Sequence, residues 1–212
     1  MGPSAAPSLS RCDTGASGHF PAHDERRPGL ARCRPALGTY VKIALRGASD
    51  DELIEHSRAA FAEIERVERA LSFHDPHSEL SRVNREAATR PLRLSQDLRT
   101  VLDFGSRLSR STGGLFDVTV APELVRRGAL PDHGVDVGVQ ASWHDVRLEG
   151  DTVRFDRPLL IDLGGIAKGY AVDRAMAVIP PEVAATVNAG GDLRMRPWRD
   201  ETLAVEVPDG RR

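Results

Sequence analysis

The chain reads Leu159-Leu160-Ile161-Asp162-Leu163-Gly164-Gly165-Ile166-Ala167-Lys168-Gly169-Tyr170-Ala171-Val172-Asp173 across the stretch that decides its fold. An apolar strand is predicted to end in Asp162, and Lys168 follows two glycines in the first turn of a helix. Gly164 and Gly165 let backbone amides approach an anion closely, while the helix N-terminus adds unpaired N–H groups and the positive end of a dipole. This layout is typical of a polyphosphate site and indicates a nucleotide ligand.

Two common phosphate-binding loops do not fit this order of residues. A Walker A loop needs Ser or Thr directly after Gly-Lys, so that a hydroxyl reaches magnesium, and here the order is Lys168-Gly169-Tyr170. A dinucleotide fingerprint reads G-x-G-x-x-G, which residues 164–169 do not supply. The residues alone leave one plain alternative open, a glycine-rich corner with a solvated Lys168.

The element pattern predicts an α+β fold, with mixed sheets and packed helices. Helices are expected over 50–71, where Ser49 and Glu52 form a capping box, over about 96–111 after Ser95, and from the glycine turn to a stop before Pro180. Residues 145–148 and 152–155 flank Glu149-Gly150-Asp151 and predict a hairpin. Further strands are expected at 39–46, 116–120, 159–162, 184–188 and 202–207.

Composition bounds the class of protein. The 212 residues include 29 basic and 31 acidic side chains, so no basic footprint for nucleic acid exists. Residues 1 to about 35 lack apolar periodicity and predict a disordered leader before one domain over 36–212. Cys12 and Cys33 fall in this leader and suit neither a disulfide framework nor a zinc site. With no signal peptide, membrane anchor or span of about 20 apolar residues, the cytoplasm is the expected compartment.

Five sequence blocks follow the order and spacing of a known family. They are Leu37-Gly38-Thr39 before the strand, Leu71-Ser72-Phe73-His74 with Ser78-Glu79-Leu80-Ser81-Arg82-Val83-Asn84, residues 112–122, residues 162–173 and Asn188-Ala189-Gly190-Gly191-Asp192. Together they resemble the ApbE family of FAD:protein FMN transferases, from about residue 36 to the end of the chain. The resemblance implies an enzyme that moves FMN from FAD onto a Thr or Ser of an acceptor flavoprotein and releases AMP. It also implies FAD as substrate and Mg²⁺ as the bound metal.

The resemblance assigns site residues by their place in these blocks. The cofactor-binding positions that it implies are Leu37, Gly38, Thr39, His74, Leu115, Phe116, Asp117, Asp162 and Lys168. Asp162 would accept a hydrogen bond from a flavin or ribose group, and Lys168 would contact the phosphates. Gly165 aligns with a position that contacts magnesium, where a glycine offers only its backbone carbonyl.

Several of these positions also have ordinary structural explanations. Asp162 could be a helix N-terminal acid, Phe116 a core residue, and His74 a solvated loop residue. Asn188 and Asp192 bracket a Gly-Gly turn, and both residue types favour turns. Leu37 replaces the family's usual methionine, a change that conserves volume and should keep an apolar contact.

One departure from the family pattern is large. Family members continue into a His-x-x-Asp-Pro segment and an Asp-Ala-x-x-Thr segment that holds magnesium, and neither occurs in these 212 residues. The sequence therefore predicts a chain truncated at its C-terminal side, whose transferase activity is impaired. An FAD-binding module without transferase activity and a nucleotide-binding regulatory domain without flavin remain as alternatives.

Overall fold

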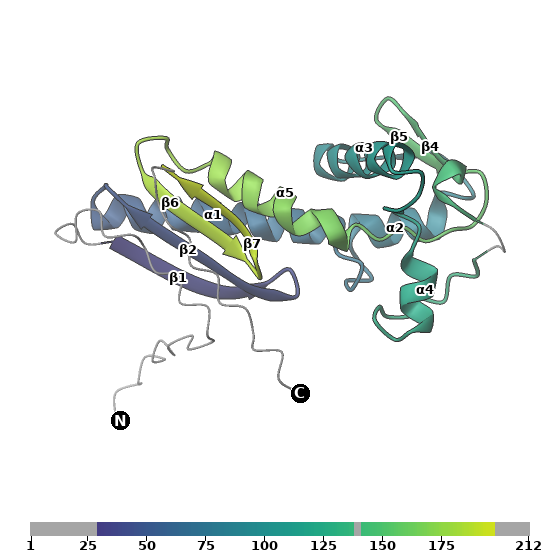
Figure 1. The fold of residues 1–212 in the computed structure, drawn as a ribbon, viewed down its shortest axis with the longest axis horizontal. Helices are drawn as coiled ribbons and strands as arrows, with labels where there is room; N and C mark the ends of the chain where they lie inside the picture. Colours follow the sequence, from purple (N-terminus) through teal and green to yellow (C-terminus); the bar gives the residue numbers. More distant parts are fainter. Residues whose placement is uncertain (1–28, 138–140, 198–212) are drawn as a thin grey trace, which may run out of the picture.

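The computed structural model describes residues 29–137 and 141–197 (Figure 1). Its elements are β1 Gly29–Ala36, β2 Thr39–Arg46, α1 Asp50–Leu71, α2 Glu79–Glu86, β3 Leu92–Arg93, α3 Gln96–Ser111, α4 Ala121–Arg126, a short 3-10 helix Trp143–Asp145, β4 Val146–Glu149, β5 Thr152–Phe155, α5 Gly164–Ala177, β6 Ala184–Ala189 and β7 Asp192–Arg196. The α+β fold with packed helices is confirmed, but both sheets of the described residues are antiparallel rather than mixed. None of the helices in the described ranges is both long and apolar enough to cross a membrane.

A four-stranded sheet forms one end of the molecule, and we call it the large sheet. Its order is β1-β2-β6-β7, and each neighbouring pair is antiparallel. Helix α1 packs against β1 and β2, while α5 packs against β6 and β7. Val41 in β2 pairs with Ala189 in β6, so the β1–β2 turn and the β6–β7 turn lie at the same end of this sheet.

The two long helices form where local signals place them. Helix α1 begins after Ser49, whose side chain accepts from the Glu52 N–H while Glu52 reaches back, which confirms the capping box. Its buried residues, among them Phe61, Ile64 and Val67, recur at helical spacing and face the core. Helix α3 likewise begins after Ser95, whose hydroxyl accepts from the Leu98 N–H.

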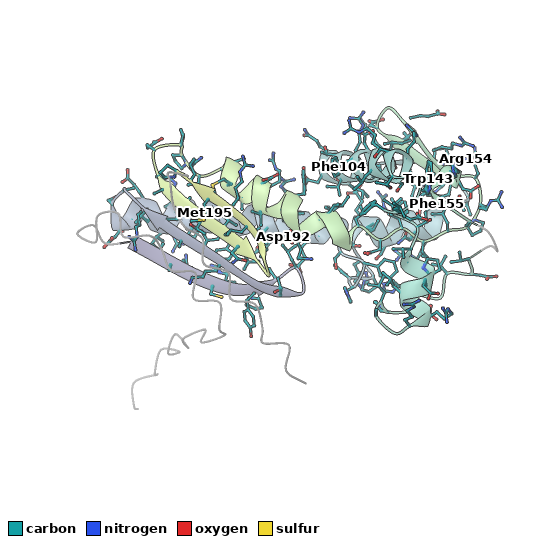
Figure 2. All side chains as sticks on the ribbon, viewed as in Figure 1. Phe104, Trp143, Arg154, Phe155, Asp192 and Met195 are labelled. Atoms are coloured by element: carbon teal, nitrogen blue, oxygen red, sulfur yellow. The ribbon has the colours of Figure 1, made fainter. Side chains whose placement is uncertain are left out.

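The other end of the molecule carries a three-stranded sheet in the order β3-β5-β4, surrounded by α2, α3 and α4 (Figure 1). Strands β4 and β5 form the expected hairpin. Figure 2 shows Phe155 of β5 within this end, and Asp192 at the end of the large sheet that faces it. Apolar side chains of both ends belong to one continuous core, from Ile43 in β2 to Phe155.

Two predicted strands are wrong. Residues 116–120 form a turn that leads into α4, and residues 159–162 are a buried extended segment outside both sheets. The apolar composition of both segments correctly indicated burial, but a β-strand also needs a neighbouring strand to form hydrogen bonds with its backbone. In the segment 159–162, the side-chain amide of Asn84 forms these bonds instead, to the N–H and carbonyl of Ile161.

The predicted leader boundary also needs correction. Strand β1 begins at Gly29, so residues 29–35, including Cys33, belong to the large sheet. Apolar periodicity is weak here because two arginines face α1: Arg34 stacks its guanidinium over the Phe61 ring at 4.5 Å, and Arg32 donates to Ser57 at 3.1 Å. Cys12, the rest of the expected leader and the expected strand at 202–207 lie outside the described residues.

Candidate functional site

Segments from five sequence blocks meet between the large sheet and the opposite end of the molecule. The β1–β2 turn, the β6–β7 turn, the loop after α1, the turn at 115–119 and the N-terminus of α5 converge there (Figure 1). Their contacts join them directly, since Leu37 bonds to α1 and Lys168 of α5 lies beside Asp192 of β7. The structure thus brings together residues that the sequence singled out separately.

The N-terminus of α5 has the geometry of an anion-binding helix end. The carboxylate of Asp162 accepts from the Gly164 N–H at 3.1 Å, and the Leu163 carbonyl accepts from Ile166 and Ala167 at 3.0 and 2.8 Å. Leu163, at the N-cap, makes no side-chain capping bond. The Gly164, Ile166 and Ala167 N–H groups are therefore bonded within the chain, and the Gly165 N–H is the first-turn group left for a ligand, at the positive end of the helix dipole.

Lys168 adds a full positive charge to this helix end. Its Nζ lies 3.5 Å from the Gly164 carbonyl oxygen and 3.9 Å from a carboxylate oxygen of Asp192. Both contacts are long for a charged donor, and the side chain is 35% exposed. The ammonium can therefore turn to a phosphate without losing a strong partner.

Asp162 lies within this positive region but out of full contact with water. Burial raises the pKa of its carboxyl above the ordinary aspartate range, while the N–H groups of Gly164 and Leu163 and the charges of His74 and Lys168 partly oppose that rise. The same interactions show that His74 and Lys168 both reach the electrostatic neighbourhood of this carboxyl. A carboxyl so placed accepts hydrogen bonds from a bound ligand and disfavours a second negative charge at close range.

The β1–β2 turn is a strained two-residue hairpin held from α1. Leu37 and Gly38 both have positive φ, 56° and 69°, which is the type I′ geometry of tight hairpins. A leucine in this conformation is unfavourable, and its N–H donates to the Glu68 carboxylate at 2.8 Å. Thr39 then lies against Gly190 of the neighbouring turn, where an added Cβ would come 2.6 Å from its hydroxyl oxygen.

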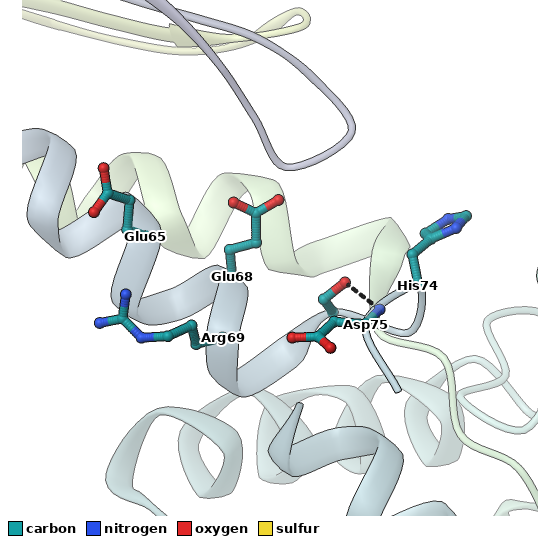
Figure 3. A pocket seen from close by; sticks show the side chains of 6 residues that line it. Glu65, Glu68, Arg69, His74 and Asp75 are labelled. Carbon is teal, nitrogen blue, oxygen red and sulfur yellow. Dashed lines mark hydrogen bonds between the residues drawn. The ribbon is translucent and has the colours of Figure 1, made fainter. Parts of the chain in front are cut away.

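A hollow of about 490 Å³ lies beside this turn at the C-terminal part of α1 (Figure 3). It is lined by Glu65, Glu68, Arg69, Ser72, His74 and Asp75. Figure 3 shows the carboxylate of Glu68 directed toward the β1–β2 turn and His74 on the loop that follows α1. The lining of this hollow carries three carboxylates and one guanidinium, so an uncharged ring with N–H donors fits it better than a phosphate does. A phosphate would be attracted to the N-terminus of α5 instead.

The loop that carries His74 is fixed by serine hydroxyls and a second histidine. Ser78 donates to the Ser72 carbonyl at 2.5 Å, Ser81 donates to the Asp75 carbonyl at 2.7 Å, and the His133 ring bonds to the Phe73 carbonyl at 2.7 Å. Ser78 and Ser81 are buried. His74 is consequently presented on a rigid loop rather than a freely moving one.

Residues 115–117 show three different environments. Leu115 is 94% exposed, Phe116 packs partly against the core, and a Cβ on Gly165 would lie 3.4 Å from the Phe116 ring. Asp117 accepts from the N–H and hydroxyl of Thr119 at 2.8 and 2.7 Å. The structure therefore uses Asp117 in a local turn and Phe116 in packing, and their cofactor-binding roles stay predictions.

Metal ligation by Gly165 also stays a prediction, and its position argues against it. Gly165 lies in the first turn of α5, where a carbonyl points along the helix toward the N–H four residues later and away from the open N-terminus. Within residues 29–137 and 141–197, no group of three or more His, Cys, Asp or Glu side chains could hold a metal ion.

Sequence reasoning missed Asn84 and Glu68, although Asn84 stands in one of the blocks. Asn84 bonds the backbone of Ile161 and Glu68 bonds that of Leu37. The sequence did contain a signal for Asn84. Ser78 is a typical helix N-cap residue, and Asn84 follows it on the same face of the short helix as the buried Leu80.

These segments coincide with a family-wide pattern, since a model described as the ApbE family matches residues 37–210. The chain belongs to the ApbE family. It is 31% identical over 197 residues to the FAD:protein FMN transferase of Vibrio cholerae serotype O1, covering 82% of this chain and 58% of that protein. The FAD:protein FMN transferase of Haemophilus influenzae is 29% identical over 167 residues, covering 67% of this chain and 47% of the relative.

The fold agrees with solved structures of the same family. The flavin transferase ApbE from Vibrio cholerae superposes with a TM-score of 0.70 at 26% identity, covering 80% of this chain and 59% of that one. This ApbE chain thus spans about half to three fifths of the length of the relatives described.

Proposed function

We propose that this ApbE chain forms the flavin-nucleotide site of an FAD:protein FMN transferase, which moves FMN from FAD onto a Thr or Ser of an acceptor flavoprotein. The observation that carries the proposal is the open N-terminus of α5 with Lys168 and Asp162, placed next to the other family blocks. Relatives that match 82% and 67% of this chain are named FAD:protein FMN transferases, which favours a transferase over a binding module of the same family.

The two surroundings described above would orient FAD along the site. The pyrophosphate would lie at the first turn of α5, where the Lys168 ammonium and the Gly165 N–H stabilise negative charge and offset repulsion by the Asp162 carboxylate. A neutral ring would lie toward the acidic hollow near His74 and Leu37. Asp162 would accept a hydrogen bond from a flavin or ribose group between these two regions.

The transfer needs no nucleophile from this chain. The acceptor hydroxyl oxygen attacks the phosphorus of the FMN half, a new O–P bond forms, the pyrophosphate bond breaks, AMP leaves, and the hydroxyl proton passes to solvent. Negative charge grows on the phosphoryl and leaving oxygens as the bond breaks. The Lys168 ammonium and the positive N-terminal end of α5 stabilise that charge.

Magnesium enters this proposal only through the family resemblance. The described residues do not fit a magnesium site of their own, because the Gly165 carbonyl is directed along its helix and no group of three or more His, Cys, Asp or Glu side chains among them could hold a metal ion. No step is therefore assigned to a metal here.

Titration with FAD tests the proposed site directly. Flavin fluorescence anisotropy of the 212-residue chain should show saturable binding, and Lys168→Ala and Asp162→Ala should each raise the dissociation constant about tenfold, the loss of one charge-assisted hydrogen bond. Arg58→Ala, which removes an exposed charge from α1, is the control and should leave the affinity unchanged. Unchanged affinity in both site variants would contradict the placement of FAD.

A transfer assay then separates an enzyme from a binding protein. The chain is incubated with FAD and an acceptor flavoprotein domain, and covalent flavin is followed as fluorescence on a denaturing gel together with AMP release. Because the sequence predicts impaired activity, the expected result is labelling weaker than that by a full-length relative, lost when the acceptor hydroxyl is removed and slowed further by Lys168→Ala. FAD binding without labelling or AMP release would overturn the transferase assignment for this chain.

A further inference from the structure

Asn84 makes an unusual pair of hydrogen bonds across the molecule. It lies in α2, is buried, and bonds one residue that is 77 positions away in sequence: its Nδ2 donates to the Ile161 carbonyl at 3.0 Å, and its Oδ1 accepts from the Ile161 N–H at 2.8 Å. A neighbouring antiparallel strand would satisfy both groups of one residue in the same way. One side-chain amide therefore replaces a strand at this point.

The replacement matters because Ile161 has no access to water. Its side chain is 0% exposed, and residues 159–162 belong to neither sheet. The adjoining backbone contact is a single bond from the Asp162 N–H to the Val118 carbonyl at 2.9 Å. Without the amide, a buried N–H and a buried carbonyl would both lack a partner.

The held residue stands directly before the site. Asp162 follows Ile161, its carboxylate accepts from the Gly164 N–H, and α5 begins at Gly164. Leu163 lacks a side-chain cap, so the path of the chain through 161–163 decides where the open helix end lies. A shift at Ile161 therefore moves Asp162 and the first turn of α5 together.

We propose that Asn84 is a positioning residue of the flavin-nucleotide site, whose amide fixes Asp162 and the N-terminus of α5 by bonding both backbone groups of Ile161. The proposal rests on the proposed function for its ligand, FAD. It assigns Asn84 no contact with FAD, and it explains why an asparagine, which carries one donor and one acceptor side by side, stands in a short helix on the far side of the buried segment.

Asn84→Asp is the sharpest test because it keeps the volume and exchanges the donor for an acceptor that faces the Ile161 carbonyl. Asn84→Ala is the second variant, since its smaller side chain leaves room for water to reach Ile161. Val83→Ala is the matched control: Val83 is buried on the same helix and contributes packing alone. The temperature of thermal unfolding is measured for all three variants. FAD affinity and amide hydrogen exchange are then measured at a temperature where each variant is folded.

All three variants should unfold at lower temperature than the unchanged chain. The Asn84 variants should in addition bind FAD about tenfold more weakly, the effect of one misplaced charge-assisted contact, and exchange amide hydrogens faster over 159–166. Val83→Ala should show neither change. Wild-type exchange over 159–166 in both Asn84 variants, or an equal loss of FAD affinity in Val83→Ala, would overturn the positioning role.

Failure of the proposed function would give a different result. A wild-type chain that does not bind FAD would remove the ligand from the site, whereas the exchange comparison would still decide whether Asn84 holds the segment before Asp162.

Discussion

The carboxyl of Asp162 is partly buried and lies at the positive N-terminal end of α5. Burial raises its pKa, whereas the neighbouring N–H groups and positive charges lower it. The sequence predicted that Asp162, Gly165 and Lys168 lie close together, because they are neighbours on one strand-to-helix corner. It did not predict Glu68 or Asn84 as supports. Their partners, Leu37 and Ile161, are backbone groups 31 and 77 residues away, and only the tertiary fold brings them within bonding distance.

The raised pKa of Asp162 predicts a pH-dependent effect of Asp162→Asn on stability. Because the folded-state pKa lies above the unfolded one, the ionised carboxyl lowers stability at neutral pH, and this penalty disappears below the ordinary aspartate pKa of about 3.9. Asp162→Asn should therefore melt at a higher temperature than the unchanged chain at pH 7, and the difference should shrink as the pH falls toward 4.

The control for this prediction is Asp173→Asn on the same helix, where the carboxylate is exposed and paired with Arg194. Differential scanning fluorimetry across pH gives both curves. A melting difference for Asp162→Asn that stays constant with pH would show that burial does not govern its ionisation.

At the scale of elements, the sequence predicted what local chemistry determines and failed where a distant partner decides. Helices α1 and α3 begin at the predicted caps because the capping hydroxyl lies within a few residues of the N–H that it accepts from. The predicted strands at 116–120 and 159–162 failed because no chain pairs with them in a sheet. Strand β1 was missed because its inward side chains include arginines that pack through their stems.

Helix α2 is hydrogen-bonded to two segments of the site, the loop that carries His74 and the segment that leads to Asp162. Its N-cap Ser78 accepts from the Ser81 N–H at 3.0 Å and donates to the Ser72 carbonyl, while Asn84 near its other end holds Ile161. One short helix thus fixes both the loop of His74 and the segment of Asp162. The family block that contains Ser78 and Asn84 is explained by this double attachment.

Ser78→Ala should consequently destabilise more than an ordinary cap loss. It removes an N-cap hydroxyl and leaves the partly buried Ser72 carbonyl without its donor, which together should lower the free energy of unfolding by about 2 kcal/mol. Ser49→Ala, at the exposed cap of α1, is the matched comparison and should cost about 1 kcal/mol. Urea unfolding measures both, and equal losses would argue that the second bond of Ser78 contributes nothing.

At the scale of the whole molecule, α1, α3 and α5 are joined by a charged network between the two sheets. Asp97 of α3 is 5% exposed, accepts from the Tyr170 hydroxyl of α5 at 2.7 Å, and pairs with Arg66 of α1. Arg66 also forms an ion pair with Glu63 at 2.6 Å, and Glu63 forms a second ion pair with Arg174 of α5 at 3.2 Å. We expect this network to set the position of α5 along α1, and with it the distance between the α5 N-terminus and the hollow beside His74.

Arg66→Met tests this network because it keeps the apolar stem and removes the charge that compensates buried Asp97. An ionised carboxylate left with only a tyrosine hydroxyl is strongly unfavourable, so the free energy of unfolding should fall by about 3 kcal/mol. Arg58→Met on the same helix breaks a pair whose side chains are 60% and 67% exposed, and should change it by less than about 0.5 kcal/mol. High salt should reduce the loss of unfolding free energy in Arg58→Met and leave the loss in Arg66→Met unchanged, because buried ion pairs are screened little by salt. Similar losses in the two variants under urea would mean that Asp97 is compensated without Arg66, and that α5 is positioned by apolar packing on α1 alone.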